Sequence, residues 1–488
     1  MEENKVEFSK QLNKNVHLIQ KRLHHTSDLL IRTIQIGEST HLHEVAIVYM
    51  DSIANSQIIR DCIVTPLLII QSINEKENLV QRIAYRHIRS ESIKILQSVN
   101  DSIEGIVSGK TLILIDGYDS GIIVDTTEWQ QRSVEKSIRQ STAEGPTIGF
   151  SEQVKVNINL IRGYIQSENL CVETKKVGRF TKKEVSIIYI NGKVDEIALN
   201  EVRSRIDSLN IEYAFELSVV DDALSGSQSI FPLAYITELP DVTVSALYEG
   251  RVVVIMNGTP QALIIPNLFI QFLQQPNDYY MRTGRLANRI ITLICFLMTI
   301  LLPGIYLAIA NFHENWLPKK FSDKYFTHGE TILPFFWEIS LLLFLLYVLG
   351  IASYRIPKDL IILASLVGTT VISSTAVDAK LIHPLSLVIV GITFLTQLLF
   401  MAAGMSSPTF SLRFIFLLIG NFLGVTAIGI GLMLLIIYIS RLKSVGVPYL
   451  APIIPFNAKE FKDVFYRGNL KKLINSQHTY PHDKNDKK

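Results

Sequence analysis

Cysteine and net charge are both scarce in this 488-residue chain. It has three cysteines, Cys62, Cys171 and Cys295, which are too few for a framework of disulfides. Its 47 Lys and Arg nearly balance its 45 Asp and Glu, which leaves a formal net charge of +2. A nucleic-acid binder that is basic over its whole surface is therefore excluded, and we expect no nucleic acid among its partners.

Charge is missing above all from residues 290–440, which hold only 13 charged side chains. The same region contains four apolar stretches of about 20 residues, the length that crosses the hydrocarbon core of a bilayer. They are 290–310, 332–351, 384–403 and 414–438. Buried helices of a soluble protein would not be expected to repeat such a run four times so closely. We therefore predict an α-helical polytopic membrane domain in contact with the lipid bilayer.

The flanks of this region predict its orientation. The first 27 residues contain no apolar core of a signal peptide, so we expect the preceding residues to stay in the cytoplasm. Arg282, Arg285 and Arg289 just before the first stretch agree, because short cytoplasmic flanks are enriched in Lys and Arg. The tail 441–488 is also basic. Both the N- and the C-terminus are thus expected on the cytoplasmic side.

Two ends on one side require an even number of crossings. We therefore predict four spans and assign a fifth uncharged stretch, 360–377, to a re-entrant segment, because irregular polar backbone is tolerated at membrane depth when it is buried in protein. This stretch is rich in hydroxyl groups: Ser365, Thr369, Thr370, Ser373, Ser374 and Thr375.

Five side chains are candidates for lining an ion path: Ser365, Thr369, Thr370, Ser373 and Glu338. A face of hydroxyls can meet water, although Ser and Thr in membrane helices also bond carbonyls of their own helix. An acid within a span costs about 2.5 kcal/mol or more to desolvate, which marks Glu338 unless it lies within reach of headgroup water. Gly420 and Gly424, four residues apart, predict a close helix–helix contact instead.

The water-facing part predicts a multi-domain α/β region with two related subdomains. A β-branched run, Val45–Tyr49, precedes a helical stretch, and Val185–Tyr189 precedes another, with Val, Ile and Tyr at matching positions. Three matches in five strand positions are weak support for a duplication. The expected organisation is a helical lead-in 1–37, subdomains 38–140 and 141–240, a connector 241–289, the membrane domain 290–440 and the tail 441–488.

No pattern in the chain predicts catalysis. The stretch Gly105–Thr111 looks like a phosphate loop, but it has three residues between its glycines where a true loop has four, and it leads into a strand instead of a helix. We interpret it as a hairpin turn with Lys110 in solvent. No His or Cys cluster has the spacing of a metal site, and we expect neither an enzyme nor a cofactor.

A series of short motifs resembles the A subunits of GerA-type bacterial spore germinant receptors, a spore germination protein family. The motifs run in order over more than 300 residues: Gly145–Glu152 with Asn157 and Arg162, Phe231–Pro232, Glu238–Asp241, Tyr248–Arg251, Asn257–Pro260, Asp278–Arg282, Phe312–His313, Ala376–Ala379 with Pro384, and Ser444–Pro452. The chain departs from the family at Glu144 and Leu239, where Arg is expected, and at 341–346, which lacks the charges of relatives.

The resemblance implies a non-enzymatic receptor subunit in the spore inner membrane. It implies a permease-like B subunit and a lipoprotein C subunit as partners, a homo-oligomer of A subunits, and an ion channel that opens in response to small nutrients and triggers germination. Two alternatives stay open. One is a small-solute transporter, although the inverted pair of interrupted helices typical of that class is not recognised. The other is a membrane-anchored scaffold whose cytoplasmic α/β domain binds a ligand.

Overall fold

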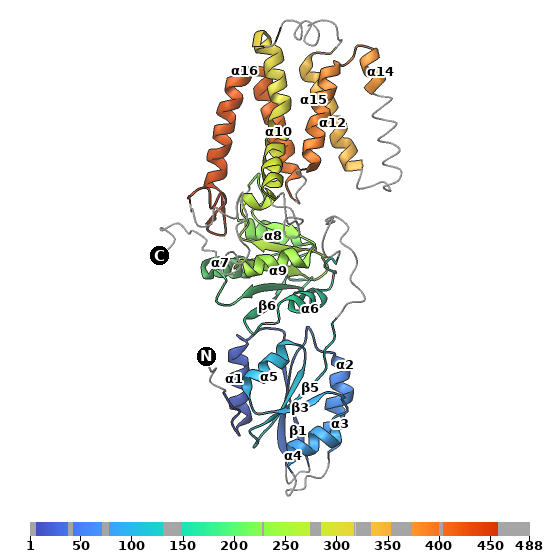
Figure 1. Ribbon diagram of the computed structural model, residues 1–488, viewed down its shortest axis with the longest axis vertical. Helices are drawn as coiled ribbons and strands as arrows, with labels where there is room; N and C mark the ends of the chain where they lie inside the picture. The colour runs from blue at the N-terminus through green and yellow to red at the C-terminus, as the bar shows by residue number, and fades with distance from the viewer. Residues whose placement is uncertain are drawn as a thin grey trace.

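The computed structural model describes residues 6–37, 42–70, 78–129, 148–226, 229–273, 285–316, 318, 333–352, 373–399 and 404–456. Two subdomains of mixed strands and helices and one helical domain follow each other along the long axis of the molecule (Figure 1). The first subdomain lies farthest from the helical domain, and the second lies between them. The expected mixture of α and β structure, followed by apolar helices, is confirmed.

The first subdomain is an antiparallel sheet with helices on both faces. Its strands are β1 (Leu29–Ile36), β2 (His43–Met50), β3 (Ile93–Leu96), β4 (Thr111–Ile115) and β5 (Gly121–Val124), in the order β1-β2-β4-β5-β3. One face is covered by α1 (Leu12–Arg22) and α5 (Val99–Val107). The other is covered by α2 (Ser56–Ile58), α3 (Thr65–Leu68), α4 (Leu79–Arg82) and the π-helical turns Ile59–Val64 and Ile83–His87. Because helices cover both faces, β2 is apolar at consecutive positions.

The second subdomain repeats this plan. Its strands are β6 (Leu170–Val177), β7 (Lys183–Ile190), β8 (Tyr235–Thr237), β9 (Val252–Met256) and β10 (Ala262–Ile265), in the order β6-β7-β9-β10-β8. Helices α6 (Val154–Tyr164) and α9 (Pro240–Tyr248) pack on one face, and α7 (Glu196–Asp207) and α8 (Leu217–Ser225) pack on the other. A 3-10 turn, Phe269–Leu273, follows β10.

The two subdomains share local hydrogen bonds in addition to their strand order. The Asn15 side chain exchanges two bonds with the backbone of Ser9, at 2.9 and 2.6 Å, before α1. Asn157 and Ser151 exchange the same two bonds, at 2.8 and 2.7 Å, before α6. The same strand order with the same helix-start bonds supports the prediction that the two subdomains are related.

Two expected boundaries fall inside sheets. Strand β1 lies within 1–37, which was expected to be a helical lead-in, and it pairs with β2 along its whole length. Strands β9 and β10 lie within the expected connector 241–289, yet β9 pairs with β7 of the second sheet. Each sheet therefore extends beyond the expected subdomain, because the edge strand β1 comes from the expected lead-in and the inner strands β9 and β10 come from the expected connector.

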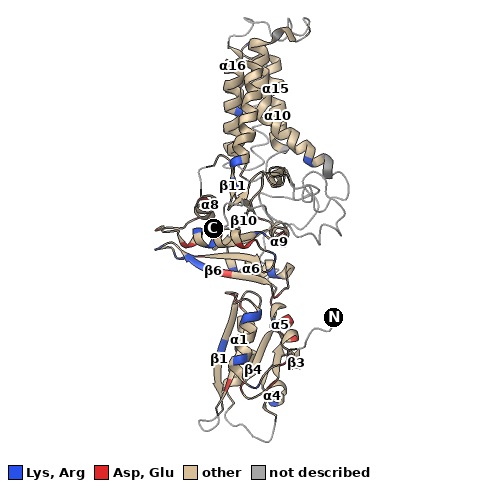
Figure 2. Ribbon diagram, turned by 90° about the vertical axis from the view of Figure 1, so that its left-hand side faces the viewer, with Lys and Arg blue, Asp and Glu red and all other residues tan. Residues whose placement is uncertain are grey.

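The helical domain consists of α10 (Arg285–Phe312), a short turn Glu314–Trp316, α12 (Phe335–Ala352), α14 (Ser373–Asp378), α15 (Pro384–Leu399) and α16 (Ser406–Arg441). Figure 2 shows that Lys, Arg, Asp and Glu are rare here and frequent in the subdomains. Helices α10 and α16 are long and apolar enough to cross a membrane, and α12 and α15 are shorter apolar helices. Two short strands, β11 (Lys443–Ser444) and β12 (Val447–Pro448), follow α16.

Helix α16 is folded back on itself at Gly424, so the stretch 414–438 is not one straight span. Gly424 has a non-helical backbone with φ 76°, which glycine adopts without a steric penalty. A Cβ on Gly431 would lie 3.1 Å from Cε1 of Phe416, although the two residues would be about 22 Å apart along a straight helix. We call residues 406–423 the first limb of α16 and residues 425–441 its second limb.

Both ends of the folded helix lie at the second subdomain. A Cβ on Gly404, just before the first limb, would lie 3.5 Å from Pro232, and the Tyr438 hydroxyl on the second limb accepts a hydrogen bond from the Ile230 backbone at 3.2 Å. The two limbs therefore run away from the second subdomain and back (Figure 1).

The expected re-entrant segment, 360–377, falls largely outside the described residues. Its neighbour α12 begins at the far end of the helical domain, where Phe335 stacks on His383, and approaches the second subdomain at Tyr347, which stacks on Phe410 of the first limb. Helix α14 lies at the far end again (Figure 1). The described flanks thus lie at opposite ends of the helical domain, whereas a re-entrant segment needs both flanks at one end.

Candidate functional site

A buried ion pair joins the two subdomains. Arg162 of α6 donates from Nε to Oδ2 of Asp28 at 2.6 Å and from Nη2 to Oδ1 at 2.8 Å. Asp28 lies just before β1, and both side chains are buried. The carboxylate also accepts hydrogen bonds from the hydroxyls of Thr26, at 2.6 Å, and Ser52, at 2.7 Å. The described hydrogen bonds of the Asp28 carboxylate are thus all made to residues at the boundary between the two subdomains.

The environment of Asp28 keeps its carboxyl ionised. Burial alone would raise the pKa of Asp28, but the charge of Arg162 and the hydrogen bonds from Arg162, Thr26 and Ser52 outweigh it and hold the pKa below its ordinary value. A paired buried charge of this kind fixes the relative position of two elements, because loss of either partner leaves the other desolvated.

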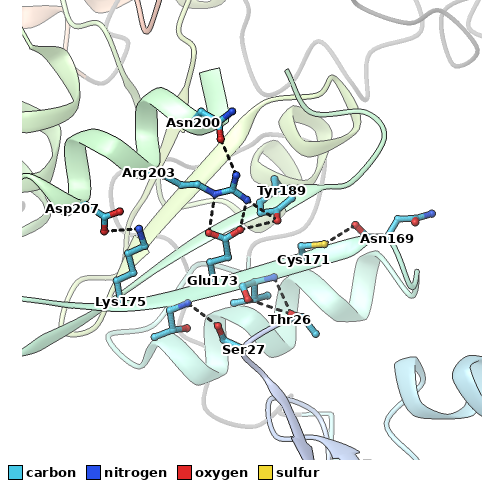
Figure 3. Close-up of polar contacts among 12 residues, drawn as sticks. Thr26, Ser27, Asn169, Cys171, Glu173, Lys175, Tyr189, Asn200, Arg203 and Asp207 are labelled. Atoms are coloured by element: carbon cyan, nitrogen blue, oxygen red, sulfur yellow. Dashed lines mark hydrogen bonds and ion pairs between the residues drawn. The ribbon is translucent and has the colours of Figure 1, made fainter. Parts of the chain in front are cut away.

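The segment beside Asp28 also extends the contact to the edge of the second sheet. The Ser27 backbone N–H donates to the Val172 carbonyl at 2.7 Å, and the Val172 N–H donates to the Thr26 hydroxyl at 3.0 Å. The Thr174 N–H donates to the Ser27 hydroxyl at 3.1 Å (Figure 3). Because β6 is an edge strand, these bonds occupy backbone groups that would otherwise be open to solvent.

A second polar cluster lies between β6, β7 and α7. Arg203 donates from Nε to Glu173 at 3.0 Å and contacts it again through Nη2, and the Tyr189 hydroxyl donates to Glu173 at 2.8 Å (Figure 3). Burial and the hydrogen bond to Glu173 raise the pKa of Tyr189, so it remains a neutral donor. These groups bond each other, which is typical of a structural cluster.

The junction between the second subdomain and the helical domain is a clamp made by the segment after α16. The Ser444 hydroxyl donates to the Leu233 carbonyl at 2.6 Å and accepts from the Asn267 N–H at 2.9 Å. The Tyr449 hydroxyl donates to the Pro232 carbonyl at 3.0 Å. We call Ser444 and Tyr449 with these three partners the C-terminal clamp. Burial raises the pKa of Tyr449, so its hydroxyl stays protonated.

Aromatic rings continue the C-terminal clamp into α10. Phe231, beside Pro232, packs edge-on against Phe269 with ring centroids 6.2 Å apart, and Phe269 packs against Phe296 of α10 at 5.6 Å. Tyr449 packs against Phe269 at 6.3 Å. These rings belong to one hydrophobic cluster that includes residues of the second sheet, α10 and both limbs of α16. A displacement of the sheet therefore acts directly on these helices, because close-packed interiors transmit strain.

Glu338 lies in a buried network at the far end of the helical domain. Its carboxylate accepts from the His383 ring at 2.8 Å, from the His383 backbone at 3.2 Å and from the Ser386 hydroxyl at 2.8 Å. Ser386 also bonds the Tyr306 hydroxyl of α10 at 3.0 Å. Glu338 is 0% exposed, so it faces the inside of this chain and links α12, α15 and α10.

The two glycines expected at a helix contact have different places. Gly420 lies against α10, because a Cβ there would overlap the carbonyl oxygen of Gly304. Gly424 is the turn between the two limbs, and a Cβ there would lie 3.3 Å from the His313 ring. The Asn311 side chain donates to Asn421 beside this turn at 3.0 Å.

The other predicted path residues are not brought together by the described structure. Ser365, Thr369 and Thr370 lie outside the described residues, and Ser373 is the first residue of α14. Within the described residues, no group of three or more His, Cys, Asp and Glu side chains is placed to hold a metal ion.

The segment that resembles a phosphate loop is a helix end, and the expected hairpin turn is wrong. The N–H groups of Ser108, Gly109 and Lys110 donate to carbonyls of α5, at 3.2, 3.0 and 3.0 Å. Gly109 has φ +96°, as is common where a helix ends, and β4 follows as expected. A phosphate needs free N–H groups at a helix start, and these are at a helix end and already bonded.

Sequence reasoning missed the roles of Asp28 and of the C-terminal clamp. Arg162, Ser444 and Tyr449 lie within motifs that carry the family resemblance, which is the signal that could have pointed to them. Asp28 lies in no such motif, and 134 positions separate it from Arg162.

Comparisons with known proteins point to one family. The family described as Bacillus/Clostridium GerA spore germination protein matches residues 17–479. Spore germination protein KA of Bacillus subtilis (strain 168) is 31% identical over 468 residues, which cover 95% of this chain and 86% of that protein. Spore germination protein B1 of the same organism is 27% identical over 476 residues, which cover 95% of each. The solved N-terminal domain of the A subunit of the Bacillus megaterium spore germinant receptor GerK3 is 25% identical, with a TM-score of 0.41, covering 55% of this chain and 99% of that one.

Proposed function

Because this chain belongs to the Bacillus/Clostridium GerA spore germination protein family, we propose that it is the A subunit of a spore germinant receptor. The observation that carries the proposal is the match over residues 17–479, which takes in both subdomains and the helical domain. In this role the subunit works with a permease-like B subunit and a lipoprotein C subunit, and it responds to small nutrients.

We infer that the helical domain lies in the spore inner membrane with both termini on the cytoplasmic side. Only 22% of the most apolar window of α16 is buried in the chain, whereas the core helix of a soluble protein is mostly buried. Its exposed side chains include Phe422, Leu423 and Met433. Exposed apolar side chains of this size and number are costly in water, and lipid or another copy of the chain would cover them.

The proposed mechanism is mechanical coupling through the C-terminal clamp. A nutrient signal that moves the second subdomain would pull on Ser444 and Tyr449, and through them on the second limb of α16 and on α10. In an oligomer of A subunits this movement would open an ion path. Ser365, Thr369, Thr370 and Ser373 remain the proposed lining of that path. Glu338 is assigned to packing within one chain, because its carboxylate is buried among α12, α15 and α10.

Spores in which the native gene is replaced by a Ser444→Ala or Tyr449→Phe variant test the proposal. We expect slower nutrient-triggered ion release at unchanged protein amount, because each substitution removes a hydrogen bond of the C-terminal clamp. Ser440→Ala is the matched control, since within the described residues the Ser440 hydroxyl bonds only the Ile437 carbonyl of its own helix. If deletion of the gene leaves the response to every nutrient unchanged, the receptor role is wrong. If deletion of the gene abolishes the response but Ser444→Ala and Tyr449→Phe release ions like the parent protein, the coupling route is wrong.

A further inference from the structure

Arg413 is an arginine buried inside the helical domain. Arg413 lies on the first limb of α16, and only 5% of it is exposed. It is one helical turn beyond Thr409, whose hydroxyl donates to the Met405 carbonyl just before the limb. Its neighbours come from two other helices: Thr299 from α10 and Gln397 from α15. The guanidinium group is therefore enclosed where three apolar helices meet.

The hydrogen bonds of Arg413 leave part of its capacity unused. Nε donates to the Thr299 carbonyl at 3.0 Å, and Nη2 donates to Oε1 of Gln397 at 2.7 Å. A guanidinium group has five N–H donors, so three remain. In the part of the chain that the structure describes, no further acceptor bonds them and no carboxylate pairs with the charge.

A cation in these surroundings needs a counter-charge. Arginine is not deprotonated in proteins, and a buried charge without a partner costs several kcal/mol. Both acceptors that the structure describes for Arg413 are neutral. Glu338, the buried acid of the helical domain, lies at the far end and is held by His383 and Ser386.

We propose that Arg413 is the fixed charge of an anion-binding site within the helical domain. The ligand is an anion that accepts two or three N–H bonds, either a small inorganic anion such as chloride or the phosphate of a lipid headgroup. Arg413 is seven residues into α16, about 10 Å from its start at the subdomain side, which is a depth that both can reach. The lipid source rests on the proposed placement of the helices in a bilayer.

The full-length protein purified in a non-ionic detergent tests the site without any germination assay. Replacing sodium chloride by sodium gluconate at equal concentration should lower the thermal unfolding midpoint by about 3 °C or more, because the anion stabilises the folded state that binds it. In gluconate, vesicles of phosphatidylglycerol should restore the midpoint if a headgroup is the ligand, and vesicles of phosphatidylcholine should not.

Substitutions separate Arg413 from general salt effects. Arg413→Met should abolish the dependence on the anion, and Arg413→Lys should keep part of it because the charge remains. Arg441→Met is the matched control, since Arg441 is exposed at the end of the same helix and should leave the dependence intact.

The outcomes identify the anion or overturn the proposal. Sensitivity to chloride in detergent identifies an inorganic anion, and sensitivity to phosphatidylglycerol alone identifies a lipid headgroup. The proposal is overturned if the wild-type midpoint is indifferent to both, a result that does not depend on whether any variant folds. It is overturned equally if Arg413→Met and Arg413→Lys retain the full dependence of the wild type.

Discussion

Arg162 and Asp28 depend on each other, because replacing either one leaves the other charged and buried. We expect Arg162→Met to lower the free energy of unfolding of the subdomains by about 3–5 kcal/mol. The double variant with Asp28→Asn should recover part of this loss, since no unpaired charge then remains. Thermal or urea unfolding of the purified protein measures both.

An exposed ion pair across the same boundary is the control for this prediction. Lys155 of α6 contacts Asp51, which follows β2, at 2.9 Å, and its side chain is 48% exposed. Lys155→Met should cost less than about 1 kcal/mol, because solvent screens exposed pairs. Equal losses for Lys155→Met and Arg162→Met would mean that burial of the pair contributes nothing.

Asp221 on α8 should make stability depend on pH in the opposite sense to an ordinary paired acid. Burial raises the pKa of Asp221 to about 6, a hydrogen bond from Ser225 lowers it, and neighbouring Asp222 raises it. Its folded pKa is above the unfolded value of about 3.9, so its contribution to stability is lost as pH rises from about 4 through about 6. Asp221→Asn should therefore stabilise the protein by about 1–3 kcal/mol at pH 7.5 and by less than about 1 kcal/mol at pH 4.5.

The pH comparison also has a control within the same helix. Asp222 is exposed, so Asp222→Asn should change the unfolding midpoint little at either pH. A stabilisation of Asp221→Asn that is as large at pH 4.5 as at pH 7.5 would rule out the raised pKa as its cause.

At the residue scale, the sequence marks one partner of each important pair. Arg162 belongs to a recognisable motif, and Glu338 is conspicuous as an acid in an apolar stretch. Asp28 and His383 are not conspicuous, because what makes them important is a contact across many positions of the chain. The partner of a buried charge is decided by tertiary packing, which no local pattern encodes.

At the element scale, the fold of α16 gives a sharp test. Cysteines at positions 419 and 431, introduced as Ile419→Cys and Gly431→Cys in a variant without the native cysteines, should react together with a short bifunctional thiol reagent. A Cβ on Gly431 would lie 3.2 Å from Cδ1 of Ile419. In a straight helix twelve residues would separate the two positions by about 18 Å. Mass spectrometry detects the intramolecular product.

Leu293→Cys with Ile305→Cys is the control pair. These positions are also twelve residues apart, and both lie on α10, which does not fold back. They should not be bridged by the same reagent. If the reagent bridges neither pair, the result contradicts the fold at Gly424.

The crossing of α10 and the first limb of α16 should be sensitive to a single methyl group. A Cβ on Gly420 would overlap the Gly304 carbonyl, so Gly420→Ala should destabilise the helical domain by about 1–3 kcal/mol. Gly429→Ala is the control, because nothing lies within 4 Å of a Cβ there. The thermal midpoint of the detergent-purified protein measures the difference, and equal midpoints for the two variants would contradict this contact.

Sequence patterns predict which residues form elements better than how the elements bend. The strands at Val45–Tyr49 and Val185–Tyr189 and the apolar helices are predicted, because periodicity and length are local properties. The turn at Gly424 is not predicted, since 414–438 contains several glycines in an unbroken apolar run. Which of them becomes the turn depends on contacts with Phe312 and His313, which lie on another element.

At the scale of the whole molecule, the duplication is visible in the sequence once the fold indicates where to look. Phe8-Ser-x-Gln and Phe150-Ser-x-Gln begin the two repeats, and Asn15 and Asn157 follow at the same spacing. Asp116 and Asn257 then close equivalent bonds, each accepting from the N–H of the first residue of α1 or α6. Strand residues alone do not reveal this repeat, because β-branched residues are common in strands and make chance agreement frequent there.

The arrangement of the helices finally predicts on which side of the membrane each end of α12 and α14 lies. Helix α12, which contains Ile351 in its last turn, ends at the subdomain end of the helical domain, and α14, which Ala379 directly follows, lies at the far end (Figure 1). If the subdomains are cytoplasmic, an impermeant maleimide should label Ala379→Cys in intact cells, and Ile351→Cys only after permeabilisation. With four spans and a re-entrant segment, both positions would instead be cytoplasmic. Protection of Ala379→Cys in intact cells, together with its labelling in opened cells, would restore the four-span topology and contradict the placement of α14.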